Sequence, residues 1–219
     1  MKSILVIGMG RFGRHFAERM QQLGNDVMVV DKDPELIDEI AYEFTDAHIG
    51  DCCNEAVLSS LGINNFDICF VTIGEDFQAS LEITSMLKEH GATHVVSKAR
   101  TSRQATLLAK IGADEVVYPE REVADKLAVR YNADNIFDYI QLTSEYSIYE
   151  IPCCSKWVNK SVAEVNVRNK YNINIIAVKR DNALQIAPGG DFVFKEADHL
   201  VVIGKASDVF RLGGKAKIK

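Results

Sequence analysis

The spacing of three glycines near the N-terminal end constrains the fold more than any other feature of this chain. Gly8, Gly10 and Gly13 form the pattern G-x-G-x-x-G directly after the apolar run at residues 4–7. A continuous apolar run is typical of a parallel strand that is buried on both faces. An amphipathic segment that extends to about residue 23 follows the glycines. A strand, a glycine loop and a helix in this order predict a βαβ unit.

Each glycine has its own expected role in such a unit. Gly8 permits the tight turn out of the strand, Gly10 lets a phosphate approach the backbone, and Gly13 lets the helix pack against the strand. The N-terminal N–H groups and the positive dipole end of the helix then face the phosphate. The sequence therefore predicts a nucleotide site. The alternative is a Rossmann-like fold that has lost its ligand.

Asp31 closes the next apolar run, at about the distance from the glycines that a dinucleotide site requires. A carboxylate at this place can accept hydrogen bonds from both hydroxyls of a ribose. It also repels a 2′-phosphate, which argues against NADP, although the neighbouring Lys32 weakens that argument. We therefore expect Asp31 and Lys32 at the ribose end of the site.

Two arginines accompany the glycine loop. Arg11 and Phe12 lie inside the loop, and Arg14 follows one turn into the helix. A pyrophosphate already receives hydrogen bonds from helix amides, so an added guanidinium suggests further negative charge, such as a terminal phosphate. We place Arg11 and Phe12 among the binding residues. The alternative for both arginines is a solvated surface position.

Strand and helix patterns alternate through the first part of the chain. The expected strands after the first are residues 27–30, 47–49, 68–73, 94–97 and 115–118, and the expected helices are 34–44, 54–61, 76–90, 103–111 and 120–131. Asp33 is expected to cap the helix that begins at Pro34. This alternation predicts an α/β fold with a Rossmann-like, doubly wound parallel sheet of about six strands.

Ligands of such sheets bind beyond the carboxyl ends of the strands. The residues expected there are Asp51 and Cys52 after the third strand, Thr72, Ile73 and Gly74 after the fourth, and Lys98 and Arg100 after the fifth. Gly50 and Asp51 are placed to meet the base, and the two cations are placed to meet ribose or phosphate. Glu120 follows the sixth strand, where its carboxylate either holds a metal ion against a phosphate or caps the next helix.

The pattern changes near residues 132–137. The expected elements beyond this point are an alternating strand at 146–152, a helix at 161–170, and strands at 173–179, 183–186 and 198–203. These predict a small α+β domain with a mostly antiparallel sheet. We expect a nucleotide-binding domain at residues 1–134 and a second domain at 135–219, with a frayed tail.

Composition excludes several function classes. A formal net charge of −6 disfavours a nucleic-acid partner. No apolar stretch reaches the roughly 18 residues that span a bilayer, and the opening strand leaves no room for a signal peptide, so we expect a cytoplasmic protein. The five cysteines include two adjacent pairs, which do not have the spacing of zinc ligands.

No catalytic pattern follows the predicted nucleotide site. The chain contains no Tyr-x-x-x-Lys, no G-x-x-x-x-G-K-[ST] phosphate loop, no G-x-S-x-G and no H-E-x-x-H. A dehydrogenase needs an acid or base beside the nicotinamide. We therefore expect a protein that is not an enzyme, with an NAD-dependent oxidoreductase as the alternative. A transcription factor ranks third, because a helix-turn-helix with a basic face is missing.

Seven short segments together resemble a known family. They are Gly8–Gly13 (GMGRFG), Val30-Asp31, Gly50-Asp51, Ser97-Lys98-Ala99, Ile111–Asp114 (IGAD), Tyr118-Pro-Glu120 and, after the change in pattern, Asn166–Tyr171 (NVRNKY). In this order the segments resemble the RCK (regulator of conductance of K⁺) family, of the KtrA/TrkA type. The resemblance covers nearly the whole chain.

This resemblance implies a cytosolic, nucleotide-sensing gating subunit. Members form homodimers that assemble into rings, here an expected octamer, which dock on a membrane-embedded, KtrB- or TrkH-like K⁺-translocating subunit. By resemblance, Arg11 reaches the terminal phosphate of ATP, Asp31 holds the ribose, and Lys98 lies near ribose or phosphate. Glu120 corresponds to an acid that holds a divalent cation, Mg²⁺ or Ca²⁺, at a dimer interface, and residues 120–131 to a crossover helix. ATP or ADP is the expected ligand, with NAD(H) as the alternative.

The second domain resembles the C-terminal RCK module. In KtrA-like members this module binds cyclic di-AMP between two subunits. Arg168, Asn174 and Pro188 lie in the matching stretches. The alternative is a plain dimerisation domain.

Overall fold

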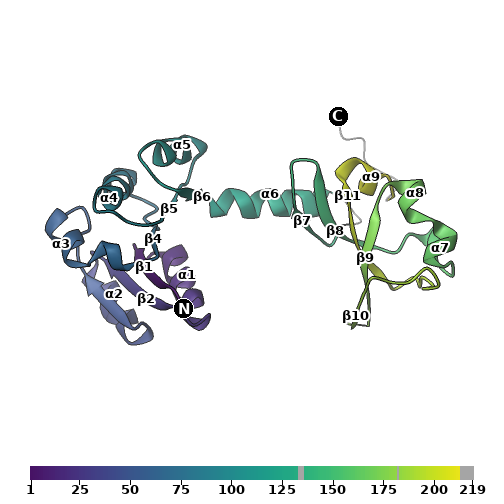
Figure 1. The fold of residues 1–219 in the computed structure, drawn as a ribbon, viewed down its shortest axis with the longest axis horizontal. Helices are drawn as coiled ribbons and strands as arrows, with labels where there is room; N and C mark the ends of the chain where they lie inside the picture. Colours follow the sequence, from purple (N-terminus) through teal and green to yellow (C-terminus); the bar gives the residue numbers. More distant parts are fainter. Residues whose placement is uncertain (133–135, 182, 213–219) are drawn as a thin grey trace. The chain divides into compact units, whose positions relative to one another are not determined.

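A computed structural model describes residues 1–132, 136–181 and 183–212 of the chain (Figure 1). The chain divides into two compact units, Met1–Arg121 and Glu122–Lys219. The division falls inside one helix, α6 (Pro119–Asn132). The domain boundary expected after residue 134 and the tail expected to fray lie outside the described residues.

The first unit contains a six-stranded sheet in which every neighbouring pair of strands is parallel. Its strands are β1 (Ser3–Ile7), β2 (Asp26–Asp31), β3 (Asp46–Ile49), β4 (Ile68–Val71), β5 (Val95–Lys98) and β6 (Glu115–Val117). The strand order is β3-β2-β1-β4-β5-β6, with the reversal at β1 and β4. This order is that of a dinucleotide-binding fold, and it confirms the predicted doubly wound sheet.

The helices of this unit begin close to the residues that the sequence indicates. They are α1 (Arg11–Gln22), α2 (Pro34–Ile40), α3 (Glu55–Ser60), α4 (Phe77–Glu89), α5 (Ser102–Lys110) and the first residues of α6. The Asp33 side chain accepts hydrogen bonds from the N–H groups of Glu35 and Leu36, as a cap should. The helix expected over residues 34–44 is shorter, because α2 ends at Ile40 and a 3₁₀ turn follows.

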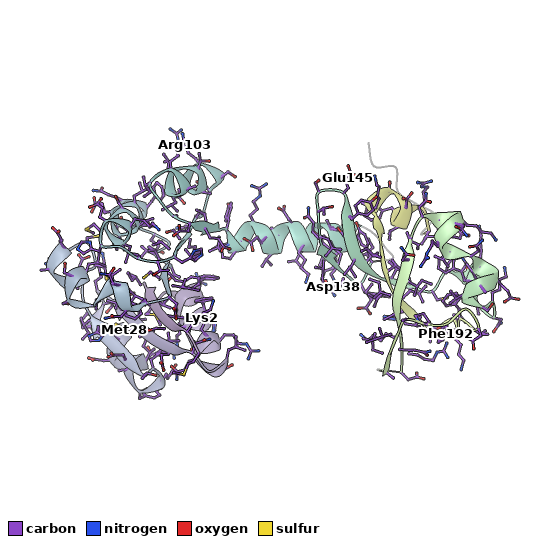
Figure 2. The ribbon with its side chains drawn as sticks, in the orientation of Figure 1. Lys2, Met28, Arg103, Asp138, Glu145 and Phe192 are labelled. Atoms are coloured by element: carbon purple, nitrogen blue, oxygen red, sulfur yellow. The ribbon has the colours of Figure 1, made fainter. Side chains whose placement is uncertain are left out.

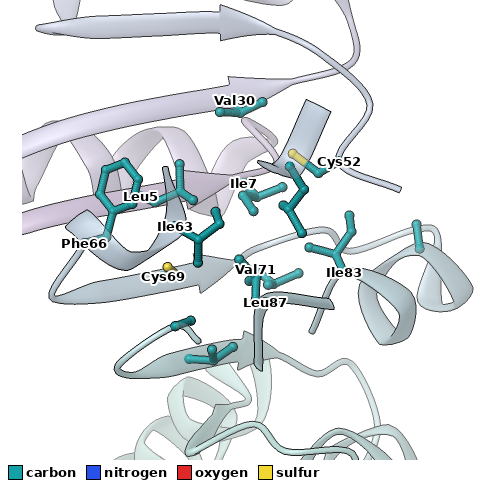
Figure 3. Close-up of a cluster of buried hydrophobic side chains, with 14 residues drawn as sticks. Leu5, Ile7, Val30, Cys52, Ile63, Phe66, Cys69, Val71, Ile83 and Leu87 are labelled. Carbon is teal, nitrogen blue, oxygen red and sulfur yellow. The ribbon is translucent and has the colours of Figure 1, made fainter. Parts of the chain in front are cut away.

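Two apolar layers hold the helices to the sheet. Alternate residues of β1 point to opposite faces, so Ile4 and Val6 pack in one layer while Leu5 and Ile7 pack in the other. The first layer contains residues of α1 and α2, and the second contains residues of α3 and α4 (Figure 3). Cys69 is fully buried in the second layer, where it packs as a small core residue.

The second unit contains a five-stranded antiparallel sheet in the order β10-β9-β11-β8-β7. Its strands are β7 (Asp138–Gln141), β8 (Tyr146–Pro152), β9 (Asn174–Arg180), β10 (Ala183–Ile186) and β11 (His199–Lys205). Trp157, Phe194 and Leu200 belong to its core. Glu145 lies between β7 and β8 (Figure 2). Its carboxylate pairs with Lys205 at 2.6 Å. The expected small α+β domain is confirmed.

One predicted helix is wrong. The segment 161–170 forms two short helices, α7 (Val162–Val165) and α8 (Val167–Tyr171), and α9 (Ala206–Leu212) follows β11. Asn166 separates α7 from α8 because its φ of 53° is left-handed. Asparagine tolerates this conformation better than most residues, so the break has a local cause that apolar spacing does not reveal.

Candidate functional site

The glycine loop is packed tightly against the residues that follow the end of β4. Gly8 has a φ of +97°, which favours glycine, and its N–H donates to the carbonyl of Val30 at 2.8 Å. A Cβ on Gly13 would lie 2.1 Å from the Gly8 carbonyl oxygen and 2.6 Å from the Thr72 hydroxyl. The close approach of helix and strand therefore requires glycine at position 13.

Gly10 differs from the other two glycines. Its φ of −63° suits any residue, and a Cβ there would meet nothing within 4 Å. The protein's own described atoms thus give no steric reason for glycine at this position. Glycine at position 10 therefore points to a molecule that approaches the loop from outside the chain.

The hydroxyl of Thr72 holds the glycine loop in place by hydrogen bonds. Thr72 is 5% exposed, and its hydroxyl lies 3.1 Å from the Ile7 carbonyl oxygen and 2.5 Å from that of Gly8. Thr72 lies beyond the end of β4 at Val71, although the sequence favoured a strand as far as residue 73. Because the hydroxyl proton is committed to these carbonyls, Thr72 positions the glycine loop.

The N-terminus of α1 is open to an anion. Gly10 is its N-cap and supplies no side-chain acceptor, and the first turn contains no acidic residue. The first N–H groups of a helix have no partner within the helix, and here no capping side chain satisfies them. Such an end binds phosphate or another anion readily.

Asp31 is held in place by the backbone on both sides. Its Oδ2 accepts a hydrogen bond of 2.6 Å from the N–H of Met9, and Oδ1 accepts one of 3.0 Å from the N–H of Asp33. Each carboxylate oxygen can accept a second hydrogen bond, so the carboxylate can still bind a diol. Lys32 beside it is exposed. The Met9 contact was not foreseen, because a backbone donor leaves no side-chain signal in the sequence.

Residues of β5, of α6 and of the loops after β4 and β5 gather next to the N-terminus of α1. The Lys98 Nζ lies 2.8 Å from Oε1 of Glu120 and 5.4 Å from the centroid of the Phe12 ring. Arg100 donates to the Gly74 carbonyl at 3.3 Å. A Cβ on Gly74 would lie 3.9 Å from the Lys98 Nζ. The candidates after β4, β5 and β6 are therefore neighbours, as the carboxyl-edge argument predicts.

Glu120 is the second residue of α6, and its partner is a lysine. The hydrogen bond from Lys98 lowers the pKa of Glu120, so the carboxylate is ionised at neutral pH. Among the described residues, no group of three or more His, Cys, Asp or Glu side chains gathers around a possible metal. The protein offers a hard cation one carboxylate here, which suits Mg²⁺ or Ca²⁺ if phosphates and water complete the shell. Its role with a cation stays a prediction.

The two arginines of the loop have different surroundings. Arg14 donates to Glu18, Glu39 and Glu43 at 3.0–3.1 Å, so its guanidinium faces α2 and the 3₁₀ turn. That network makes Arg14 a structural residue. Arg11 is exposed and has no ion-pair partner in the described part of the chain.

The candidates after β3 form a compact turn. Asp51 accepts from the N–H of Cys53 at 2.9 Å, and its own carbonyl accepts from the N–H of Asn54 at 2.9 Å. Cys52 is 2% exposed, and burial raises the pKa of its thiol to about 12. Cys52 is thus a protonated packing residue, and Asp51 is the exposed polar group of this turn.

Two of the three candidates in the second unit are in contact. The Nε of Arg168 donates to Oδ1 of Asn174 at 2.6 Å. Pro188 is half-buried and follows Ala187, whose φ is +50°. Arg168 is the second residue of α8, and Asn174 is the first residue of β9.

Two family models match the chain: the TrkA-N domain over residues 4–119 and the TrkA-C domain over residues 147–212. The chain belongs to the TrkA family. Ktr system potassium uptake protein C of Bacillus subtilis is 38% identical over 96% of this chain and 95% of its own length. Ktr system potassium uptake protein A of the same organism is 36% identical over the same shares. This membership confirms the expectations of an RCK-type protein that acts in potassium transport and is not an enzyme.

Solved structures of the GsuK channel share the fold. The NAD-bound channel has a TM-score of 0.70 at 19% identity, over 100% of this chain and 40% of that chain. The ADP-bound form has a TM-score of 0.53 at 15% identity, over 59% of this chain and 34% of that chain. This TrkA chain therefore spans less than half the length of the solved channel chains. None of its described helices is both long and apolar enough to cross a membrane.

Proposed function

We propose that this chain is a cytoplasmic, nucleotide-sensing subunit that regulates a membrane-embedded potassium transporter. The observation that carries the proposal is the match to a Ktr potassium uptake protein at 38% identity over almost the full length of both chains. A regulatory subunit needs a partner that conducts the ion. We infer a KtrB- or TrkH-like partner, and a homodimer that assembles into a ring, an octamer by family resemblance.

The nucleotide would bind across the carboxyl edge of β1, β2 and β4. The uncapped N-terminus of α1 supports a phosphate position, and the fixed carboxylate of Asp31 supports a ribose position. Gly10 would allow the phosphate to approach the backbone. Asp51 would meet the base from the turn after β3.

We infer ATP or ADP as the ligand because the phosphate end of the site is rich in cations. Arg11 is exposed beside the open helix end, and Lys98 and Arg100 lie near it. A terminal phosphate carries more charge than the pyrophosphate of a dinucleotide, and guanidinium groups favour it. NAD(H) is the second candidate, since Asp31 serves the ribose of either ligand and a channel of the same fold binds NAD.

The two nucleotide states would differ at the residues that begin α6. A ligand shifts a conformational equilibrium only by its differential affinity for the two states. ATP and ADP share the adenosine and differ at the phosphate end, where Arg11 and the Lys98–Glu120 pair lie. A phosphate that attracts Lys98 competes with Glu120, and Glu120 is then free for a divalent cation. The change would reach α6, whose later residues belong to the second unit.

The second unit would carry a second ligand. Arg168 and Asn174 present a guanidinium and an amide in direct contact, and Pro188 follows a left-handed turn. These groups suit the phosphates and adenine of cyclic di-AMP between two subunits. Dimerisation without a ligand is the other function that this unit supports.

Isothermal titration of the purified chain with ATP, ADP, NAD and NADH, each with and without Mg²⁺, tests the ligand assignment. We expect micromolar binding of ATP and ADP, and a loss mainly of the ATP preference in Arg11→Ala. Lys110→Ala is the matched control, because Lys110 is an exposed cation at the far end of α5. Binding of NAD or NADH alone would overturn the assignment.

A further inference from the structure

A groove of about 510 Å³ lies on the first unit, away from the glycine loop. The groove is lined by Glu18, Gln21, Gln22, Tyr42 and Glu43. The first three belong to α1, and the last two belong to the 3₁₀ turn that follows α2. None of these residues takes part in the nucleotide site proposed above.

The groove carries an excess of negative charge. Arg14 binds one oxygen each of Glu18, Glu39 and Glu43, so one guanidinium faces three carboxylates. The second oxygen of Glu18 lies 3.6 Å from the ring of His15, which is 83% exposed. A further cation on α1, Arg19, is committed to the Gln22 side chain at 3.1 Å.

Gln21 forms part of the wall of the groove. Its Nε2 donates to the Glu43 carbonyl at 2.7 Å, which fixes the amide between α1 and the 3₁₀ turn. Its Oε1 is buried and has no hydrogen-bond partner within the described residues. Because this oxygen is closed to solvent, Gln21 shapes the wall of the groove, and the carboxylates of Glu18 and Glu43 supply its acceptors.

Apolar side chains flank the charged groups. Tyr42 is 81% exposed, and Leu23, the C-cap of α1, is 61% exposed. An exposed aromatic ring beside a charged groove is typical of protein interfaces. The combination fits a cationic side chain on an apolar stem and is unsuited to a nucleotide phosphate.

We propose that this groove docks a cytoplasmic segment of the membrane potassium subunit that presents an arginine or a lysine. The proposal rests on the proposed function for the existence of that subunit. Cytoplasmic loops of membrane proteins carry an excess of Lys and Arg, which complements the charge of the groove. An arginine has five N–H donors, enough to serve the second oxygens of Glu18 and Glu43 together.

Binding of the full-length chain to the membrane subunit in lipid nanodiscs tests the proposal. The membrane subunit in this experiment is a KtrB- or TrkH-like protein, the class of partner inferred above. We compare the wild type with Glu18→Gln/Glu43→Gln and with Tyr42→Lys, which adds a cation at the rim and leaves the Arg14 network intact. The control is Glu55→Gln/Glu89→Gln, which removes two exposed carboxylates of α3 and α4 and changes the net charge equally.

We expect both groove variants to bind the nanodiscs at least tenfold more weakly and the control to bind within twofold of the wild type. Nucleotide affinity should be unchanged in all variants. Equal binding by the groove variants would overturn the docking proposal and leave the proposed function intact. Loss of self-association in light scattering would assign the groove to a second copy and also overturn it. Failure of the wild type to bind any potassium subunit would contradict the proposed function itself.

Discussion

The Nζ of Lys98 lies 2.8 Å from Oε1 of Glu120, and the same ammonium lies 5.4 Å from the centroid of the Phe12 ring. Lys98 ends β5, Phe12 belongs to the first turn of α1, and Glu120 belongs to the first turn of α6. One side chain thus contacts the open helix end and the helix that continues into the second unit.

Replacing Glu120 with Gln should remove the effect of Mg²⁺ on ATP binding. The pair is largely solvent-exposed on the Glu120 side, so its loss should cost less than about 1 kcal/mol of stability. Titration of ATP with and without Mg²⁺, together with thermal unfolding, measures both effects. Glu89→Gln is the control, because Glu89 is an exposed acid at the end of α4. An undiminished Mg²⁺ effect in the Glu120 variant would exclude a cation role for this residue.

Gly13→Ala and Gly10→Ala should separate folding from binding. The new Cβ at position 13 would lie 2.1 Å from the Gly8 carbonyl oxygen, so we expect a loss of about 1–3 kcal/mol from overpacking. The Cβ at position 10 meets no protein atom within 4 Å, so we expect a loss of less than about 1 kcal/mol but a clear loss of nucleotide affinity. Thermal unfolding measures the stability of each variant, and titration calorimetry measures its nucleotide affinity. Equal stability losses would contradict the loop geometry.

Asp31→Asn and Arg11→Ala should produce different selectivity patterns. Asp31 would hold the ribose that all four tested nucleotides share, so Asp31→Asn should weaken each of them by about 10- to 100-fold, as expected for a lost charge-assisted hydrogen bond. Arg11→Ala should weaken ATP more than ADP. Titration of both variants with the same ligand set decides the matter. A uniform effect of Arg11→Ala would mean that this residue does not read the terminal phosphate.

The Arg180–Asp198 pair should control the acid stability of the second unit. Asp198 is fully buried, and its carboxylate accepts from Arg180 at 2.6 and 2.8 Å and from the N–H of Lys195 at 2.7 Å. Burial raises the pKa of Asp198, but these hydrogen bonds outweigh it, so the folded pKa lies below the ordinary value. The stabilisation is therefore present above about pH 4 and is lost as the pH falls through the folded pKa.

Arg180→Met tests this pair because it leaves the buried carboxylate without its partner. We expect a loss of about 3–5 kcal/mol at pH 7. Without Arg180, burial raises the pKa of Asp198 in the variant, so its carboxyl is protonated in acid, carries no unpaired charge, and the loss at pH 3 is smaller. Urea unfolding at both pH values measures the difference. A loss that does not change with pH would show that the contribution of Arg180 is packing alone.

The sequence predicted the helices and strands of the first unit well, because capping residues mark where several of its helices begin. Asp33, Asn54 and Asp76 accept backbone hydrogen bonds at the starts of α2, α3 and α4. The buried strands are apolar runs in the sequence, and their alternation with helices predicts a parallel sheet. The break at Asn166 depends on one backbone angle, which hydrophobic spacing does not encode.

The sequence predicted which strand ends form the candidate site, but it predicted few of the contacts between the side chains there. Because ligands of such sheets bind beyond the carboxyl ends of the strands, we expected Gly74, Lys98 and Glu120 to be neighbours, and they are. The commitment of Arg14 to three glutamates was not predictable, because two of them lie 25 and 29 residues away on other elements. The groove beside Gln21 arises from the same non-local packing.

Potassium flux into vesicles that contain the membrane subunit tests the central claim most directly. Flux is measured with the wild-type chain or Arg11→Ala, in the presence of ATP or ADP. The account predicts that the wild type changes the flux and that the change differs between ATP and ADP, whereas Arg11→Ala gives nearly the same flux with both nucleotides. A flux that does not respond to the chain, or that responds equally to ATP and ADP with the wild type, would contradict the account.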